Sequence, residues 1–172
     1  MNAFSPDEIA PLLAATVATL RAEVRGLAGQ AGWRPAPGEW SVNECVGHLV
    51  EAEGRDFAGR IRLILETNGV ALADWDPPAV AAARHDEEAD PFELVESFAA
   101  LRSEGIALVR SLGPEDLDRV GIHPLVGPLV IRDLLGEWVH HDRSHVRQAL
   151  AVTQARVWPQ MGGAQRFSEL GD

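Results

Sequence analysis

The chain contains one cysteine, Cys45, among its 172 residues. A single cysteine excludes an internal disulfide and is typical of proteins kept in a reducing compartment. The sequence also lacks any run of about 18 apolar residues, the length that a transmembrane helix needs. Residues 1–7 have neither a basic start nor an apolar stretch, so we do not expect a signal peptide. These absences favour a cytoplasmic protein with no membrane partner.

Positive charge is scarce and scattered. The formal net charge is −11 at pH 7, and no stripe of basic residues is present. An acidic chain of this kind repels phosphate backbones, so we expect no nucleic-acid partner and a small-molecule substrate instead. The hydrophobic fraction of 46% is enough for one domain with a sizeable core at this length.

Three predicted helix starts carry capping boxes, in which a polar N-cap residue is followed three positions later by glutamate. They are Ser5 to Glu8, Ser41 to Glu44 and Asp90 to Glu93, and apolar residues at helical spacing follow each of them. A fourth helix is predicted from about residue 130 to residue 153. We predict an all-α, up-and-down four-helix bundle over residues 1–155, with a C-terminal tail, 156–172, that is partly packed or frayed.

Two long connections interrupt the predicted bundle, at about residues 69–89 and 113–129. No alternating pattern in them predicts a β-strand. Connections of this length with little structure of their own usually line a site or cover an interface.

Two histidines of the last helix, His141 and His145, are four residues apart and therefore leave the same face of the helix. They belong to one stripe with Leu134, Trp138 and Gln148, at positions where a bundle normally places leucine. Two such imidazoles can hold one divalent metal, although an i, i+4 pair on a helix is often only a solvated face. Neutral imidazoles at core positions need polar partners, which favours the metal site.

Several motifs resemble those of the DinB-like superfamily of metal-dependent enzymes. They are Trp40-Ser41 and Gly47-His48-Leu49 in the second helix, the stretch Leu134 to Val139, and His141-Asp142, His145 and Gln148 in the fourth. The resemblance covers roughly residues 5 to 155. It implies a four-helix bundle and three metal ligands, His48, His141 and His145. One position departs from the family pattern, because Val130 stands where the last helix usually has a threonine N-cap.

Relatives in this superfamily include thiol transferases that use low-molecular-weight thiols and a mycothiol-dependent maleylpyruvate isomerase, and many form homodimers. The resemblance therefore implies a thiol transferase in which the metal activates such a thiol for attack on a small electrophile. A hydrolase of small amides or esters that uses metal-bound water is an alternative, and a non-catalytic metal- or ligand-binding stress protein is another. Zinc and nickel are the first candidates for the metal.

Other residues near the histidines have more than one interpretation. Glu137, one turn before His141, is either a general base, a hydrogen-bond acceptor for a ligand or a surface residue. Gln148 and Glu51 are predicted to hydrogen-bond the free ring nitrogens of His145 and His48, and Glu44 is an alternative for His48. The remaining candidates are better explained without a role at the metal: Cys45 as an apolar filler, His140 as a half-exposed residue, His85 and His123 as loop residues, and Trp40 and Trp138 as core aromatics that wall the pocket.

Overall fold

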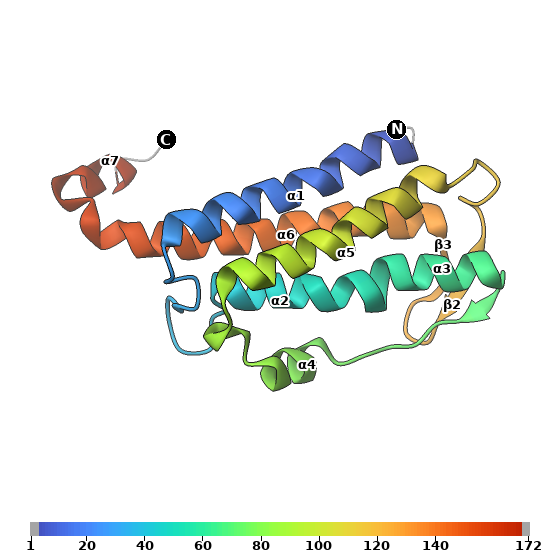
Figure 1. Cartoon of the computed structure of the whole chain (residues 1–172), viewed down its shortest axis with the longest axis horizontal. Helices are drawn as coiled ribbons and strands as arrows, with labels where there is room; N and C mark the ends of the chain where they lie inside the picture. Colours follow the sequence, from blue (N-terminus) through green and yellow to red (C-terminus); the bar gives the residue numbers. More distant parts are fainter. Residues whose placement is uncertain (1–3, 170–172) are drawn as a thin grey trace.

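A computed structural model describes residues 4–169 of the chain. Its long helical segments form a four-helix bundle, which confirms the predicted fold class (Figure 1). The segments are α1 (Pro6–Leu27), α2 (Val42–Ala52) with its continuation α3 (Ala58–Glu66), α5 (Pro91–Ser111) and α6 (Ile131–Val157).

The three predicted N-caps are all present. Ser5 and Ser41 each form a complete capping box, with Glu8 and Glu44 respectively. Asp90 accepts the backbone N–H groups of Phe92 and Glu93 at the start of α5. These contacts satisfy backbone donors that the first turn of a helix cannot pair internally, so the local sequence alone sets these three helix starts.

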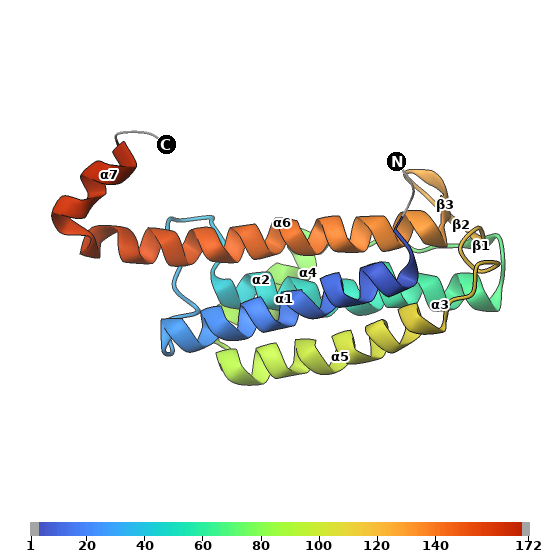
Figure 2. The ribbon, with the colours of Figure 1, turned by 90° about the horizontal axis from the view of Figure 1, so that it is seen from above.

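The direction of the helices does not alternate strictly along the chain, so the bundle departs from the predicted up-and-down order. The continuous path of α2 and α3 runs in the same direction as α5, whereas α1 and α6 run the opposite way (Figures 1 and 2). α1 and α2 each pack against both α5 and α6. The long connection after α3 makes this order possible, because it returns along the bundle past α4 (Pro77–Arg84) before α5 begins.

The two long connections contain short strands that the sequence did not predict. β1 (Val70–Ala71) pairs in parallel with β2 (Val120–His123), which pairs antiparallel with β3 (Gly127–Val130). Two to four residues are too few for an alternating pattern to be read from sequence. The strands form because the two connections meet at one end of the bundle, where their backbone groups pair with each other.

The start of α6 shows how the missing threonine cap is replaced. Val130 is the N-cap residue and has no side chain that accepts a hydrogen bond. Instead, the backbone N–H groups of Ile131 and Arg132 donate to the carbonyl oxygens of Arg119 and Leu117. The preceding connection thus satisfies donors that a side chain would otherwise serve, and the helix still begins where it was predicted.

A π-helical turn, Glu53–Phe57, joins α2 to α3 and was not predicted. Such a turn holds one extra residue relative to an α-helix and shifts the faces that follow it. A Cβ on Gly59 would lie 1.7 Å from the carbonyl oxygen of Gly54, so only glycine fits at position 59. The turn directs Phe57 into the core beside Trp138, with their rings stacked at 5.3 Å.

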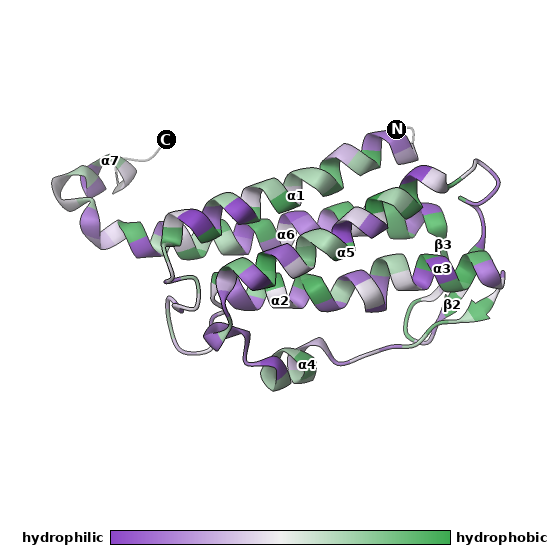
Figure 3. Ribbon diagram, viewed as in Figure 1, coloured by the Kyte–Doolittle hydropathy of each residue, from purple (hydrophilic) through white to green (hydrophobic). Residues whose placement is uncertain are grey.

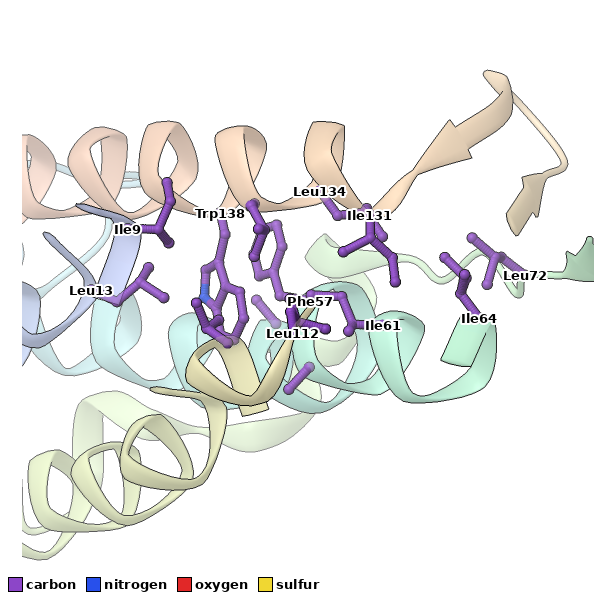
Figure 4. Close-up of a cluster of buried hydrophobic side chains, with 14 residues drawn as sticks. Ile9, Leu13, Phe57, Ile61, Ile64, Leu72, Leu112, Ile131, Leu134 and Trp138 are labelled. Carbon is purple, nitrogen blue, oxygen red and sulfur yellow. The ribbon is translucent and has the colours of Figure 1, made fainter. Parts of the chain in front are cut away.

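Two clusters of buried apolar residues fill the bundle. Hydrophobic and hydrophilic residues are interspersed along the long helices, as expected when one face of each helix is buried (Figure 3). Figure 4 shows the cluster nearer the strands, where Phe57 and Trp138 pack among aliphatic side chains. No helix in residues 4–169 combines the length and the apolar character that crossing a membrane requires.

One buried arginine links three helical segments. The Arg102 guanidinium, 1% exposed, pairs with Glu53 in the π-helical turn and with Asp142 in α6. Thr16 of α1 donates to Asp142 Oδ2 at 2.7 Å. Since Asp142 follows His141 directly, this network fixes the rotation of α6 at the point where its histidines face inward.

Beyond Val157 the chain forms two 3₁₀ turns, Trp158–Gln160 and Gly162–Ala164, and the short helix α7 (Gln165–Glu169). This segment projects past the end of the bundle (Figures 1 and 2). Trp158 is 38% exposed and Phe167 is 79% exposed. The last part of the predicted tail, 170–172, lies outside the described residues.

Candidate metal centre

Three histidines from two helices meet inside the bundle. His48 comes from α2, and His141 and His145 come from successive turns of α6. Each offers one ring nitrogen, and these nitrogens all lie within 4.8 Å of one another. The structure thus brings together the three residues that the resemblance implied, whereas their role as metal ligands stays a prediction.

Burial keeps the three imidazoles neutral. Burial, together with the positive charge of a protonated His145, lowers the pKa of His48 to about 4 and that of His141 to about 3. Burial also lowers the pKa of His145, against the opposing effect of its hydrogen bond to Gln148. A metal ligand must be a deprotonated nitrogen, so the site has the protonation state that metal binding needs near neutral pH.

The predicted contact of Gln148 is present. His145 Nδ1 lies 3.1 Å from Gln148 Oε1, an oxygen that can only accept a hydrogen bond. His145 therefore carries its hydrogen on Nδ1 and leaves Nε2 free as a lone-pair donor. Hydrogen bonds of this kind set the tautomer and orientation of metal-binding histidines.

The nitrogen atoms fit a divalent metal. His48 Nε2 and His141 Nε2 are 3.0 Å apart, close to the separation of about 3.3 Å between two nitrogen ligands of a tetrahedral zinc ion. The other ring nitrogens, His48 Nδ1 and His141 Nδ1, are buried and have no hydrogen-bond partner among the described residues. Three neutral ligands leave the charge of a metal uncancelled and leave coordination positions open, which is characteristic of catalytic sites.

Aromatic rings enclose the three imidazoles. Trp40 stacks on His145 at 5.9 Å between ring centres, as predicted for a residue that walls the site. Trp138 does not have that position, because it lies fully buried in the core, where it stacks on Phe57. The ring centre of Phe57 lies 5.2 Å from that of His141. Trp75 was not predicted, and it stacks on His48 at 5.9 Å.

The prediction for Glu51 is wrong in this structure. Its carboxylate binds Arg55 and Arg84 rather than His48, whose Nδ1 has no partner in the part of the chain that is described. The alternative, Glu44, is likewise bound to Arg34 and to the cap residue Ser41. Sequence spacing placed both glutamates on α2 near His48, but arginines from other segments compete for them.

A pocket of about 490 Å³ opens beside His141. Glu137 lines it one turn before His141, is exposed, and forms no ion pair within residues 4–169. The pocket also contains Arg60 of α3 and His123 of β2, so His123 lies closer to the candidate site than its position in a loop suggested. Arg60 and His123 are distant in sequence and meet because β2 lies against α3, which no local motif predicts.

The positions of Cys45, His140 and His85 agree with the prediction that they have no role at the metal. Cys45 is fully buried in the core, and burial raises the pKa of its thiol to about 12, which makes it a poor nucleophile or ligand. His140 is exposed on α6 outside the cluster, and His85 is 71% exposed at the end of α4.

These features place the chain among helical-bundle proteins with a candidate three-histidine metal centre. The sequence pattern that defines the DinB superfamily matches residues 12–149, and the chain belongs to this superfamily.

Two similar proteins carry names that mention a metal. The chain is 24% identical over 122 residues to "Putative metal-dependent hydrolase YfiT" of Bacillus subtilis, which covers 70% of this chain and 68% of that protein. It is also 24% identical over 122 residues to "Putative metal-dependent hydrolase OB0782" of Oceanobacillus iheyensis, covering 70% of this chain and 69% of that protein.

The solved structure of YfiT from Bacillus subtilis has the same fold. It superimposes with a TM-score of 0.80 at 22% identity, covering 89% of this chain and 88% of that one. That structure is described as having "an unusual four-helix bundle topology".

Proposed function

We propose that this protein is a metal-dependent enzyme that activates a nucleophile for attack on a small substrate. The observation that carries the proposal is the convergence of three neutral imidazoles next to a pocket. The names of the two similar proteins support metal dependence. Zinc and nickel are the ions that we propose first, since both accept imidazole nitrogen.

The protein side chains have separate tasks in this proposal. His48, His141 and His145 hold the ion, and Gln148 keeps His145 in the tautomer that binds. A divalent ion held by them would lower the pKa of a bound water or thiol and polarise a carbonyl group. Trp40 and Trp75 shield two of the imidazoles, while the pocket beside His141 receives the substrate.

The nucleophile defines two candidate reactions. The first is transfer of a low-molecular-weight thiol to a small electrophile, which the resemblance to thiol transferases supports. This reaction needs no general base in the protein, because a thiol bound to a cation ionises near neutral pH. The second is hydrolysis of a small amide or ester, in which Glu137 takes a proton from water. The exposed carboxylate of Glu137 in the pocket and the names of the two relatives favour this second candidate.

Elemental analysis tests the metal centre. We expect about one equivalent of metal in protein purified without a nickel column, and its loss in His145→Ala. His140→Ala is the matched control, because His140 lies on the same helix outside the cluster and its removal leaves the three nitrogens in place. If neither zinc nor nickel binds the wild-type protein after incubation, the metal-dependent function is wrong.

The two reactions are separated by Glu137→Gln. Under the hydrolase proposal this change lowers the rate of 4-nitrophenyl acetate hydrolysis by about 100-fold or more, the usual contribution of a general base. Under the thiol-transferase proposal, low-molecular-weight thiols change the absorption spectrum of the cobalt-substituted protein, and Glu137→Gln leaves that change intact. Glu66→Gln, an exposed glutamate of α3, is the control. If the protein retains its metal but shows neither hydrolysis nor a thiol-dependent spectral change, the non-catalytic binding protein is the function that remains.

A further inference from the structure

Two nitrogen-bearing side chains line one side of the pocket beside His141 and have no task in the proposed function. Arg60 of α3 and His123 of β2 both line it, and their side chains are 11% and 8% exposed. Arg60 Nη2 approaches within 3.2 Å of His123 Nε2. Two buried or nearly buried polar side chains therefore face each other at the edge of the pocket.

Where Arg60 Nη2 and His123 Nε2 approach each other, both nitrogens carry hydrogen and act as donors. The backbone N–H of Leu125 donates to His123 Nδ1 at 3.2 Å, so Nδ1 is an acceptor. A neutral imidazole carries one hydrogen, which must then be on Nε2. The guanidinium of Arg60 can only donate, so Arg60 Nη2 cannot accept the hydrogen on His123 Nε2, and that N–H has no acceptor at this contact.

Neighbouring residues do not supply the missing acceptor. Asp74 Oδ1 is 3.7 Å from His123 Nε2, which is beyond hydrogen-bond distance. Arg60 is held in place by Asp56 at 2.8 Å and by the carbonyl oxygen of Ala73 at 3.3 Å. Its Nε is nevertheless buried without a partner in the described part of the chain. The guanidinium is thus fixed in position, and its Nη1 donates to none of the described residues, which leaves that nitrogen to pair with an acceptor in the pocket.

The rest of the pocket limits the charge and shape of that acceptor. Phe57, Leu129 and Leu134 provide apolar walls, which fit a short hydrocarbon body. Asp56, Asp133 and Glu137 also line the pocket. Asp56 is paired with Arg60, and the other two carboxylates repel a group with two negative charges, such as a phosphate ester, more strongly than a group with one. A carboxylate carries one charge, and its two oxygens match donors that lie side by side.

We propose that the pocket binds a small carboxylic acid, with its carboxylate on Arg60 and His123 and its apolar body directed past Phe57 toward His141. This inference rests on the proposed function for the identity of the pocket as a substrate site. It adds the class of substrate, a carboxylate-bearing molecule, and two residues that recognise it.

Direct binding of a simple probe tests the inference. Hexanoate is titrated into the full-length protein by calorimetry, both with bound zinc and after chelation, and the ring signals of His123 are followed by NMR. We expect hexanoate to bind both forms and to shift the His123 signals, and hexanamide and hexylamine to bind at least about tenfold more weakly, because a charge-assisted hydrogen bond exceeds a neutral one.

Two variants assign the effect to the donors. Arg60→Gln and His123→Asn should each weaken hexanoate binding by about 10-fold or more. Asparagine at 123 can still accept the Leu125 N–H, so this variant tests the site even if Arg60→Gln fails to fold. Arg62→Gln is the matched control, since Arg62 is an exposed arginine of the same helix and does not line the pocket.

The outcomes separate this inference from the proposed function. Hexanoate binding that survives chelation and is lost in His123→Asn supports the carboxylate site even if the protein proves to hold no metal. Binding that requires zinc and is unchanged in both variants means that the carboxylate binds only the ion, and it overturns the inference while leaving the metal-dependent function intact. Equal binding of hexanamide overturns the assignment to a carboxylate.

Discussion

At the scale of single residues, the candidate site depends on contacts that orient the histidines. His145 is the clearest case, because Gln148 accepts from its Nδ1 and so directs Nε2 toward the other two rings. Sequence spacing was sufficient to predict this pair, since residues three apart on a helix are neighbours. The opposite holds for His48, where two glutamates at suitable spacing turned out to bind arginines instead.

Replacing Gln148 should weaken metal binding without removing it. We expect Gln148→Ala to lower the affinity for zinc by about 10- to 100-fold, because the tautomer and orientation of His145 are then no longer set. Competition with a zinc-binding dye measures the affinity. Gln154→Ala, an exposed position on the same helix, is the control and should leave the affinity unchanged. Equal affinities for wild type and Gln148→Ala would contradict this role.

Gly47, directly before His48, allows another segment to approach α2. A Cβ at this position would lie 1.8 Å from Asp86 Oδ2, and Arg84 holds that carboxylate in place. We expect Gly47→Ala to destabilise the protein by about 1–3 kcal/mol, as overpacking does. Urea unfolding measures the change.

Gly136 is the matched control for Gly47. It lies inside α6, and no atom lies within 4 Å of the position that a Cβ would take there. Gly136→Ala should therefore stabilise the protein by about 0.5–1 kcal/mol through helix propensity alone. A loss of stability in Gly136→Ala comparable to that in Gly47→Ala would show that the effect at Gly47 is not caused by Asp86.

At the scale of secondary-structure elements, one ionic network sets how the helices face each other. Arg102 of α5 joins the π-helical turn through Glu53 and α6 through Asp142. One guanidinium serves two buried carboxylates, and burial together with the charge of Asp142 raises the pKa of Glu53 to about 7. The π-helical turn and the rotation of α6 are therefore coupled through a single side chain.

Removing this arginine should be strongly destabilising. Arg102→Met keeps much of the side-chain volume but leaves two buried carboxylates unpaired, and we expect a loss of about 3–5 kcal/mol. Thermal and urea unfolding measure it. Arg110→Met, an exposed arginine of the same helix, should change stability by less than about 0.5 kcal/mol. Similar losses in the two variants would argue against a special role for Arg102.

At the scale of the whole molecule, the buried histidines make the stability of the metal-free protein depend on pH. Their pKa values in the folded state, about 4 for His48 and about 3 for His141, lie below the ordinary value of 6.5. The unfolded chain therefore binds more protons as the pH falls below about 6.5, and this contribution to stability is progressively lost. Glu53 acts in the opposite direction, because its raised pKa favours the folded state as the pH falls from about 7 to 4.5.

Comparison with a variant isolates the histidine contribution. In the presence of a chelator, the free energy of unfolding of the wild-type protein should decrease relative to that of His141→Leu as the pH is lowered from 6.5 to 4.5. Leucine cannot be protonated, whereas Glu53 is present in both proteins and cancels in the difference. Parallel pH profiles for the two proteins would contradict the prediction.

The oligomeric state is the last prediction for the whole molecule. We expect a homodimer, as in many members of the superfamily. Light scattering after size-exclusion chromatography measures the mass in solution, which for a dimer is twice the 18.6 kDa of one chain. A monomer across micromolar concentrations would refute the prediction. Phe167→Ser tests whether the exposed aromatic residue of the projecting segment takes part in the contact.

The sequence by itself determined the features that depend on neighbours along the chain. Three helix starts follow from Ser5, Ser41 and Asp90 because a cap and its partner are only a few residues apart. The shared face of His141 and His145 follows from the helical repeat in the same way. The family motifs extended this local information to His48 on another helix.

Tertiary structure alone decided what depends on contacts between distant segments. The parallel course of α2–α3 and α5, the three short strands and the replacement of a cap at Val130 all arise where separate connections meet. The pocket with Arg60 and His123 has the same origin. Such contacts are selected by packing and by the pairing of backbone groups across the fold, and these forces leave no fixed spacing in the sequence.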